Sequence, residues 1–117
     1  MSKNRFNADG TWNRENADKY SAILELDKKL TEANIPHVTE PLMDGWLIVY
    51  PNHKSRTGDV VEHCGSYGSG LNLMESMGFG LNDVQGFLTV DAAFAMFQKE
   101  HESRKGGGKN DKEDTDN

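Results

Sequence analysis

The most constraining feature of this sequence is a run of five consecutive residues that favour β-structure, Trp46-Leu47-Ile48-Val49-Tyr50. The turn dipeptide Asp44-Gly45 precedes the run and Pro51-Asn52 follows it, so the run is predicted to be a strand. Because glycine accepts positive φ, Asp44-Gly45 predicts a tight hairpin whose partner strand is Val38 to Met43. Pro41 has no N–H group to donate, which places the partner strand at a sheet edge or at a bulge.

A third strand is predicted after the polar loop, from Asp59 to Cys64, antiparallel to the central run. Before the hairpin, a helix is predicted to begin near Asn13 or Asn16, which are good N-caps, and to stop near Asn34 and Pro36. Its apolar side chains recur at steps of three and four residues and form one stripe that packs on the sheet. The stripe consists of Tyr20, Ile23, Leu26, Leu30 and Ala33.

The C-terminal part of the sequence predicts two further helices. Leu71 to Met77 is expected to form a short helix that Gly78 ends, and Phe79 to Phe87 to form a glycine-punctuated connection. The last helix is expected to open at Thr89, whose hydroxyl can cap the next turn. The expected fold class is therefore α+β, with an N-terminal helix packed on a three-stranded antiparallel meander, followed by two C-terminal helices.

A chain of 117 residues is large enough for one core but not for two. Residues 1–12 are predicted to be a flexible N-terminal arm and residues 13–102 a single α+β domain. Residues 103–117 contain three consecutive glycines and alternating charges without an apolar residue. Such a segment cannot bury enough surface to offset the entropy of ordering it, so we predict a disordered charged tail.

The charge of the chain points away from nucleic acid as a partner. The net charge is −6, and since the arm carries about +1 and the tail about 0, residues 13–102 carry about −7. No cluster of Lys or Arg lies within the predicted domain. No apolar run approaches the length that crosses a bilayer, so the expected location is the cytoplasm.

A glycine-rich segment between a predicted strand and a predicted helix is a candidate ligand site. Backbone N–H groups and a helix N-terminus at such a turn can hold a phosphate or a carboxylate. The segment lacks the lysine of a Walker loop and the spacing of the dinucleotide fingerprint, and a purely structural turn is the alternative. The candidate ligand-binding residues are Gly65, Ser66, Tyr67, Gly68 and Ser69.

The pair His63-Cys64, with Asp59 and Glu62 nearby, invites the hypothesis of a nucleophile and its base. Neighbouring strand residues point to opposite faces, however, so His63 and Cys64 are not expected to touch. The four histidines are scattered over different elements and the single cysteine has no closely spaced ligand partner. We therefore predict no catalytic residue, no metal site and no cofactor, and an enzyme of unknown reaction is only a minor alternative.

Large amphipathic side chains near the turns are candidates for a protein interface. They are Trp46, Tyr50, His63 and Tyr67. The alternative for Trp46 and Tyr50 is that they share, with Ile48, the face of the strand that packs on the first helix.

Several segments together resemble a family of small uncharacterised accessory proteins encoded by phages and prophages of Gram-positive bacteria. The resemblance covers about residues 17–101 and is carried by these segments: Asp44-Gly45-Trp46, Val49-Tyr50-Pro51, 62–68, 73–78 and 86–89. Cys64 and Gly78-Phe79-Gly80 depart from the family pattern. The resemblance implies a phage context and supplies no established activity or catalytic residue.

The expected function is that of a non-enzymatic phage or prophage protein that binds a host or phage protein and inhibits a bacterial function. The alternative is a protein that binds a nucleotide or another small anion through the turn Gly65 to Gly70. Assembly into a homo-oligomer is compatible with the sequence.

Overall fold

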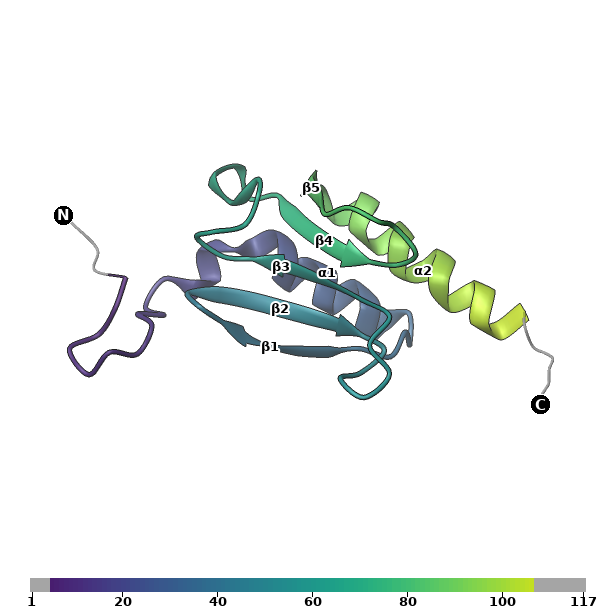
Figure 1. Ribbon diagram of the computed structural model, residues 1–117, viewed down its shortest axis with the longest axis horizontal. Helices are drawn as coiled ribbons and strands as arrows, with labels where there is room; N and C mark the ends of the chain where they lie inside the picture. Colours follow the sequence, from purple (N-terminus) through teal and green to yellow (C-terminus); the bar gives the residue numbers. More distant parts are fainter. Residues whose placement is uncertain (1–4, 107–117) are drawn as a thin grey trace.

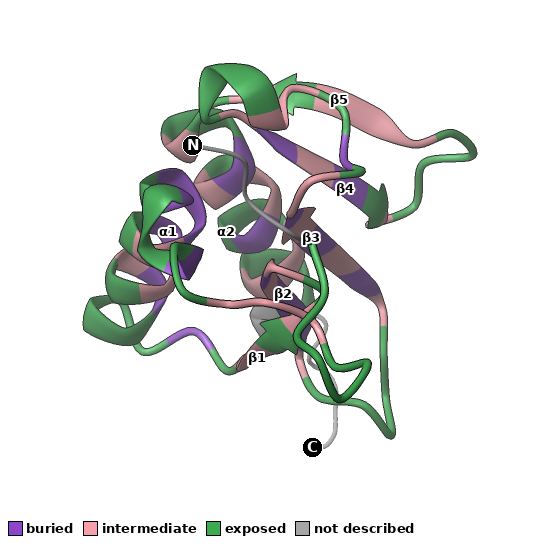
Figure 2. Cartoon of the chain, turned by 90° about the vertical axis from the view of Figure 1, so that its left-hand side faces the viewer, coloured by how far each residue is buried: buried purple, intermediate pink, exposed green. Residues whose placement is uncertain are grey.

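The computed structural model describes residues 5–106, which form an antiparallel sheet of five strands and two α-helices. The strands follow one another in the order β1-β2-β3-β4-β5, so every pair of neighbours in the sheet is also consecutive in the chain. Both helices lie behind the sheet in Figure 1 and on one side of it in Figure 2. The elements are the 3-10 helix η1 (Ala17–Lys19), α1 (Ser21–Glu32), β1 (Val38–Leu42), β2 (Gly45–Tyr50), β3 (Gly58–Glu62), the 3-10 helix η2 (Ser69–Leu71), β4 (Met74–Gly78), β5 (Gln85–Leu88) and α2 (Val90–Gly106).

The prediction of a three-stranded meander followed by two C-terminal helices is wrong. The segment that was expected to form the short helix is strand β4, which pairs with β3, and the expected connection contains strand β5. The spacing of Leu73, Met74 and Met77 resembles the apolar spacing of a helix, but in a strand every second side chain points to the same face. Met74 and Ser76 point toward the helices and are buried, whereas Met77 points to the other face and is exposed. Pairing with β3 therefore overrides the local preference of this segment.

The hairpin of β1 and β2 confirms the prediction from Asp44-Gly45. Leu42 pairs with Gly45, so the connecting loop consists of Met43 and Asp44, and it is Met43 that adopts the positive φ of 55°. Gly45 is required for a different reason, because a Cβ atom there would lie 1.9 Å from the carbonyl oxygen of Glu62. Pro41 lies in an edge strand, as its missing N–H group requires.

Helix α1 begins at Ser21, later than Asn13 or Asn16, where we predicted its start. Its N-cap residue, Tyr20, makes no capping hydrogen bond with its side chain. The N–H group of Ala22 donates instead to Oδ1 of Asn72 (3.1 Å), and that of Ile23 donates to Oε1 of Glu62 (3.2 Å). Helix α1 is therefore capped by residues from the β3–β4 part of the chain rather than by its own leading sequence.

The core lies between the helices and the sheet. Most of the predicted stripe is confirmed, since Ile23, Leu26 and Leu30 of α1 are fully buried and Tyr20, just before the helix, is buried too. Ala33, which was included in the stripe, follows the helix and is exposed. The three stripe residues of α1 pack against Ile48 and Tyr50 of β2, so β2 presents the expected face to the helices. The remaining core residues are Tyr20, Ala22, Ile35, Val60, Met74, Ala93 and Phe97.

Helix α2 begins where the sequence predicts, because the hydroxyl of Thr89 accepts a hydrogen bond from the N–H group of Ala92 (3.1 Å). The helix continues to Gly106, so residues 103–106 are helical although we assigned them to the tail. Residues 107–117 of the predicted tail and residues 1–4 of the predicted arm lie outside the described residues. Within residues 5–106, no helix combines the length and the hydropathy needed to cross a bilayer.

The capping of α1 by Asn72 can be tested with two matched substitutions. Asn72 and Asn34 both have positive φ (57° and 59°), so replacement by glycine relieves the same backbone strain at each position. Asn72→Gly also removes the hydrogen bonds to Ala22 and Ser21. We expect Asn72→Gly to be about 1 kcal/mol less stable than Asn34→Gly in urea unfolding. Equal free energies of unfolding would contradict the capping role.

Candidate functional site

The turn from Gly65 to Gly70 leads from β3 into η2, and four of its backbone N–H groups are engaged within the chain. The N–H group of Tyr67 donates to Oε1 of Glu75 (2.8 Å), and that of Gly65 donates to Nδ1 of His63 (3.0 Å). The N–H group of Ser66 donates to the carbonyl oxygen of His63, and that of Ser69 to the carbonyl oxygen of Ser66. The turn thus already binds a carboxylate, but the carboxylate belongs to the neighbouring strand β4.

Ser66 and Gly68 hold the shape of this turn. Ser66 is buried, and its hydroxyl donates to the carbonyl oxygen of His63 (3.0 Å) and accepts from the N–H group of His63 (3.1 Å). Gly68 has a φ of +92°, and a Cβ atom there would lie 3.0 Å from Cα of Phe87. Only glycine fits both requirements. The two residues therefore fix the position of Tyr67 between them.

Tyr67 lies next to a second exposed aromatic residue, Phe87 of β5. The side chains of Tyr67 and Phe87 are 63% and 60% exposed. A Cβ atom at Gly86 would lie 2.7 Å from Cβ of Tyr67, so only glycine allows this close approach. The N–H group of Phe87 donates to the carbonyl oxygen of Tyr67 at 3.5 Å.

The two aromatic residues lie near the side of β4 that points away from the helices. Leu73 lies beside Gly68 and Phe87, and the exposed Met77 shares this face of β4 with Glu75, the partner of Tyr67. We call these four residues the Tyr67–Phe87 patch: Tyr67, Leu73, Met77 and Phe87. Tyr67 was predicted from the sequence but Phe87 was not, because the segment around Phe87 was expected to be a connection. The dipeptide Gly86-Phe87 within an otherwise extended segment was the available clue.

Trp46 and Tyr50, two of the predicted interface residues, face the helices. Tyr50 is fully buried, and its hydroxyl makes a hydrogen bond with Nδ1 of His101 (3.1 Å). Trp46 is partly buried, donates from Nε1 to the carbonyl oxygen of Ala17 (3.2 Å) and has the guanidinium of Arg14 over its ring. Both residues therefore lie on the face of β2 that packs on the helices, which was the alternative to an interface role. Of the predicted interface residues, Tyr67 is the one that is exposed.

His63 and Cys64 show no sign of an activated nucleophile. Burial lowers the pKa of His63, and its Nδ1 atom accepts the N–H group of Gly65, so the ring is neutral with its proton on Nε2. Burial and the nearby carboxylate of Asp44 raise the pKa of the Cys64 thiol. A thiol with a raised pKa stays protonated at neutral pH and is a poor nucleophile.

Asp44 joins three segments around the start of α1. Its Oδ2 atom accepts the hydroxyl of Tyr20 (2.7 Å), and its Oδ1 atom accepts the N–H group of Cys64 (2.9 Å). Burial alone would raise the pKa of Asp44, but these hydrogen bonds and the ammonium of Lys19 hold it below its ordinary value. Burial and Asp44 together raise the pKa of Tyr20 far above its ordinary value, so Tyr20 remains a hydrogen-bond donor. This arrangement is structural, because each polar group already has a partner within the chain.

Glu62 is the most unusual ionisable group of the molecule. It is fully buried, and while Oε1 accepts the N–H group of Ile23, Oε2 has no hydrogen-bond partner among the described residues. Burial raises its pKa to about 7. Ser76, on the neighbouring strand and the same face, also has a buried oxygen without a partner. From the sequence, Glu62 was considered only as a neighbour of His63, whereas in the structure it shares the inward face of β3 with Val60.

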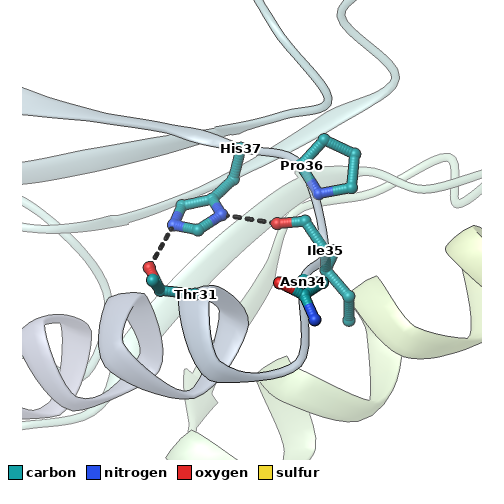
Figure 3. A pocket seen from close by; sticks show the side chains of 5 residues that line it. All are labelled: Thr31, Asn34, Ile35, Pro36 and His37. Atoms are coloured by element: carbon teal, nitrogen blue, oxygen red, sulfur yellow. Dashed lines mark hydrogen bonds between the residues drawn. The ribbon is translucent and has the colours of Figure 1, made fainter.

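A pocket of about 320 Å³ lies at the end of α1 and contains His37 (Figure 3). Nδ1 of His37 faces the carbonyl oxygen of Ile35 (2.7 Å), and Nε2 faces Oδ1 of Asp27 (2.8 Å). Since both ring nitrogens have partners, His37 connects α1 to β1 and is not placed to act as a base toward a ligand. The other lining residues are Thr31, Asn34 and Pro36.

A second cavity, of about 510 Å³, lies between η1 and η2, where Ser69 and Gly70 of the glycine-rich turn line it together with Lys19. It is open, and its wall is completed by Tyr20, Leu71 and Asn72. Among the described residues, no group of three or more His, Cys, Asp and Glu side chains is placed to hold a metal ion.

No family model matches this chain, and searches among curated proteins and solved structures found no match. The assignment of a function therefore rests on the residues themselves.

The buried carboxyl of Glu62 predicts how stability depends on pH. Its folded-state pKa is raised above its ordinary value of 4.5, so the folded state holds this proton more tightly than the unfolded state. The free energy of unfolding should therefore fall as the pH rises from 4.5 to about 7, by up to about 3 kcal/mol, and then level off.

The variant Glu62→Gln isolates this effect, because glutamine keeps an acceptor for Ile23 but does not titrate. The lowered pKa of His63 contributes with the opposite sign in the same range, and it cancels in the difference between wild type and variant. Urea unfolding at a series of pH values should show the variant gaining on the wild type as the pH rises. A difference that does not change with pH would contradict the prediction.

Proposed function

We propose that this protein acts without enzymatic activity by binding another protein through the Tyr67–Phe87 patch. The observation that carries the proposal is that two large aromatic residues, joined by a backbone hydrogen bond between their segments, are both more than half exposed. Large aromatic side chains that remain exposed near one another are typical anchors of protein interfaces. The resemblance to phage and prophage accessory proteins supports a phage or host protein as the partner and inhibition of a bacterial function as the outcome.

The rigidity of the turn supports this proposal. Tyr67 is fixed by the hydrogen bond of its own N–H group to Glu75, by the buried Ser66 before it and by Gly68 after it. A side chain whose backbone is already ordered loses little entropy on binding. A turn that served only to connect β3 with η2 would not require an exposed aromatic residue at its centre.

The engaged donors of the turn favour protein binding over the binding of a small anion. The N–H group of Tyr67, which would face an anion, is occupied by the carboxylate of Glu75. An anion at this position would have to displace that carboxylate and would meet its negative charge. We therefore prefer recognition by side chains to recognition by backbone N–H groups.

Affinity capture with matched variants tests the proposal. Tagged wild type, Tyr67→Ala, Phe87→Ala and Phe6→Ala are incubated with lysate of a Gram-positive host, and the bound proteins are quantified by mass spectrometry. Phe6 is a suitable control because it is 51% exposed and lies in the N-terminal arm. We expect a partner that Phe6→Ala retains and that both patch variants lose by about tenfold or more.

The captured protein is then purified and titrated against the same variants by calorimetry. Because Tyr67 and Phe87 are exposed, their replacement by alanine should change the free energy of unfolding by less than about 0.5 kcal/mol, so loss of binding cannot be ascribed to unfolding. Equal retention of every partner by all four proteins would refute binding through the patch.

A further inference from the structure

Residues 57–98 contain neither Lys nor Arg, but they contain five carboxylates. This stretch includes β3, β4, β5 and the first half of α2. Seven large hydrophobic side chains are exposed among the described residues, and five of them belong to this stretch: Tyr67, Leu71, Met77, Leu81 and Phe87. Most of the exposed large hydrophobic side chains of the described residues therefore belong to a stretch of sequence that has no positive charge of its own.

Three of the five carboxylates form no ion pair with a Lys or Arg of the described residues. Glu75 accepts the backbone N–H group of Tyr67, while Asp83 and Asp91 are exposed on either side of β5, the strand that carries Phe87. The other two are accounted for, because Asp59 pairs with Arg56 (2.8 Å) and Glu62 is buried. Glu75 thus lies at the Tyr67–Phe87 patch, and Asp83 and Asp91 lie four residues before and after Phe87 in the chain, without a Lys or Arg of the described residues to neutralise them.

The cations nearest to this stretch do not lie at the patch. Arg56 is paired with Asp59, and Lys19, which lies by η2, has its ammonium 3.9 Å from Asp44. Lys99, which follows the stretch, lines a cavity with Phe79 and Leu81, which are not part of the patch. An apolar patch with unpaired carboxylates beside it attracts a surface of opposite charge and repels nucleic acid. It also disfavours a second copy of this chain in the same position, since two copies would bring like charges together.

We propose that the partner of the Tyr67–Phe87 patch presents apolar side chains flanked by Lys or Arg, in other words a cationic amphipathic segment of a protein. This inference rests on the proposed function and adds the chemistry of the partner. The apolar side chains pack on Tyr67 and Phe87, and the cations approach Glu75, Asp83 and Asp91. The apolar contact supplies the affinity, and the carboxylates supply the discrimination between partners.

Three synthetic amphipathic peptides test the inference. One is built from Leu and Lys, the second has Glu in place of every Lys, and the third has Ser in those places. Each carries a fluorescent label, and its binding is followed by anisotropy in low salt and in about 200 mM NaCl. The proteins compared are the wild type, Tyr67→Ala, Phe6→Ala and the double variant Asp83→Asn/Asp91→Asn.

The expected result is binding of the Leu/Lys peptide to the wild type and to Phe6→Ala, weakened about tenfold by Tyr67→Ala. Higher salt and the double variant should each weaken this binding several-fold, because both reduce the attraction between charges. The Leu/Ser peptide should bind more weakly than the Leu/Lys peptide, and the Leu/Glu peptide should bind most weakly.

Other outcomes separate the inference from the proposed function. If all three peptides bind equally and Tyr67→Ala weakens them all, the charge requirement is refuted while binding through the patch stands. If Tyr67→Ala changes the binding of no peptide, the cationic partner is refuted, and the capture experiment decides the proposed function separately. Self-association of the wild type in analytical ultracentrifugation, abolished by Tyr67→Ala, would assign the patch to a second copy and overturn the inference.

Discussion

The structure depends on the way in which the start of α1 is joined to the far part of the sheet. Tyr20, the residue before α1, provides no side-chain cap, so two N–H groups of the first turn are satisfied by Asn72 and by Glu62. These residues lie about fifty and forty positions further along the chain. These two hydrogen bonds at the start of α1 therefore exist only when β3 and the connection to β4 are in place.

The same connection carries the surface to which we assign the function. Between β3 and β4 the chain caps α1 with Asn72 and presents Tyr67 to solvent. Ser66, Gly68 and the carboxylate of Glu75 hold the turn in one conformation. Tyr67 and Asn72 therefore have different roles. Tyr67 is exposed and is not part of the core, whereas Asn72 stabilises the start of α1. Substitutions at Tyr67 can alter binding and leave the fold intact.

The candidate site could be predicted in part. Tyr67 was identified because a large amphipathic residue in a glycine-rich turn has few structural reasons to be there. Phe87 was missed, since its proximity to Tyr67 arises from the pairing of β5 with β4 and from the close approach at Gly86. Trp46 and Tyr50 have the same residue chemistry as Tyr67 but face the helices. Residue type alone does not distinguish an anchor from a core residue, because burial depends on which face of the strand is covered.

The sequence by itself determined the elements whose pattern is local. The β1–β2 hairpin follows from a β-forming run beside a turn dipeptide, the apolar stripe and the end of α1 from periodicity and Asn34, and the start of α2 from Thr89. Only the tertiary structure decided that Met74 to Gly78 is a strand, that a fifth strand follows it and that Glu62 is buried at the first turn of α1. The physical reason is that hydrogen bonds to a neighbouring strand and contacts with a distant helix contribute more than the weak preference of a short segment.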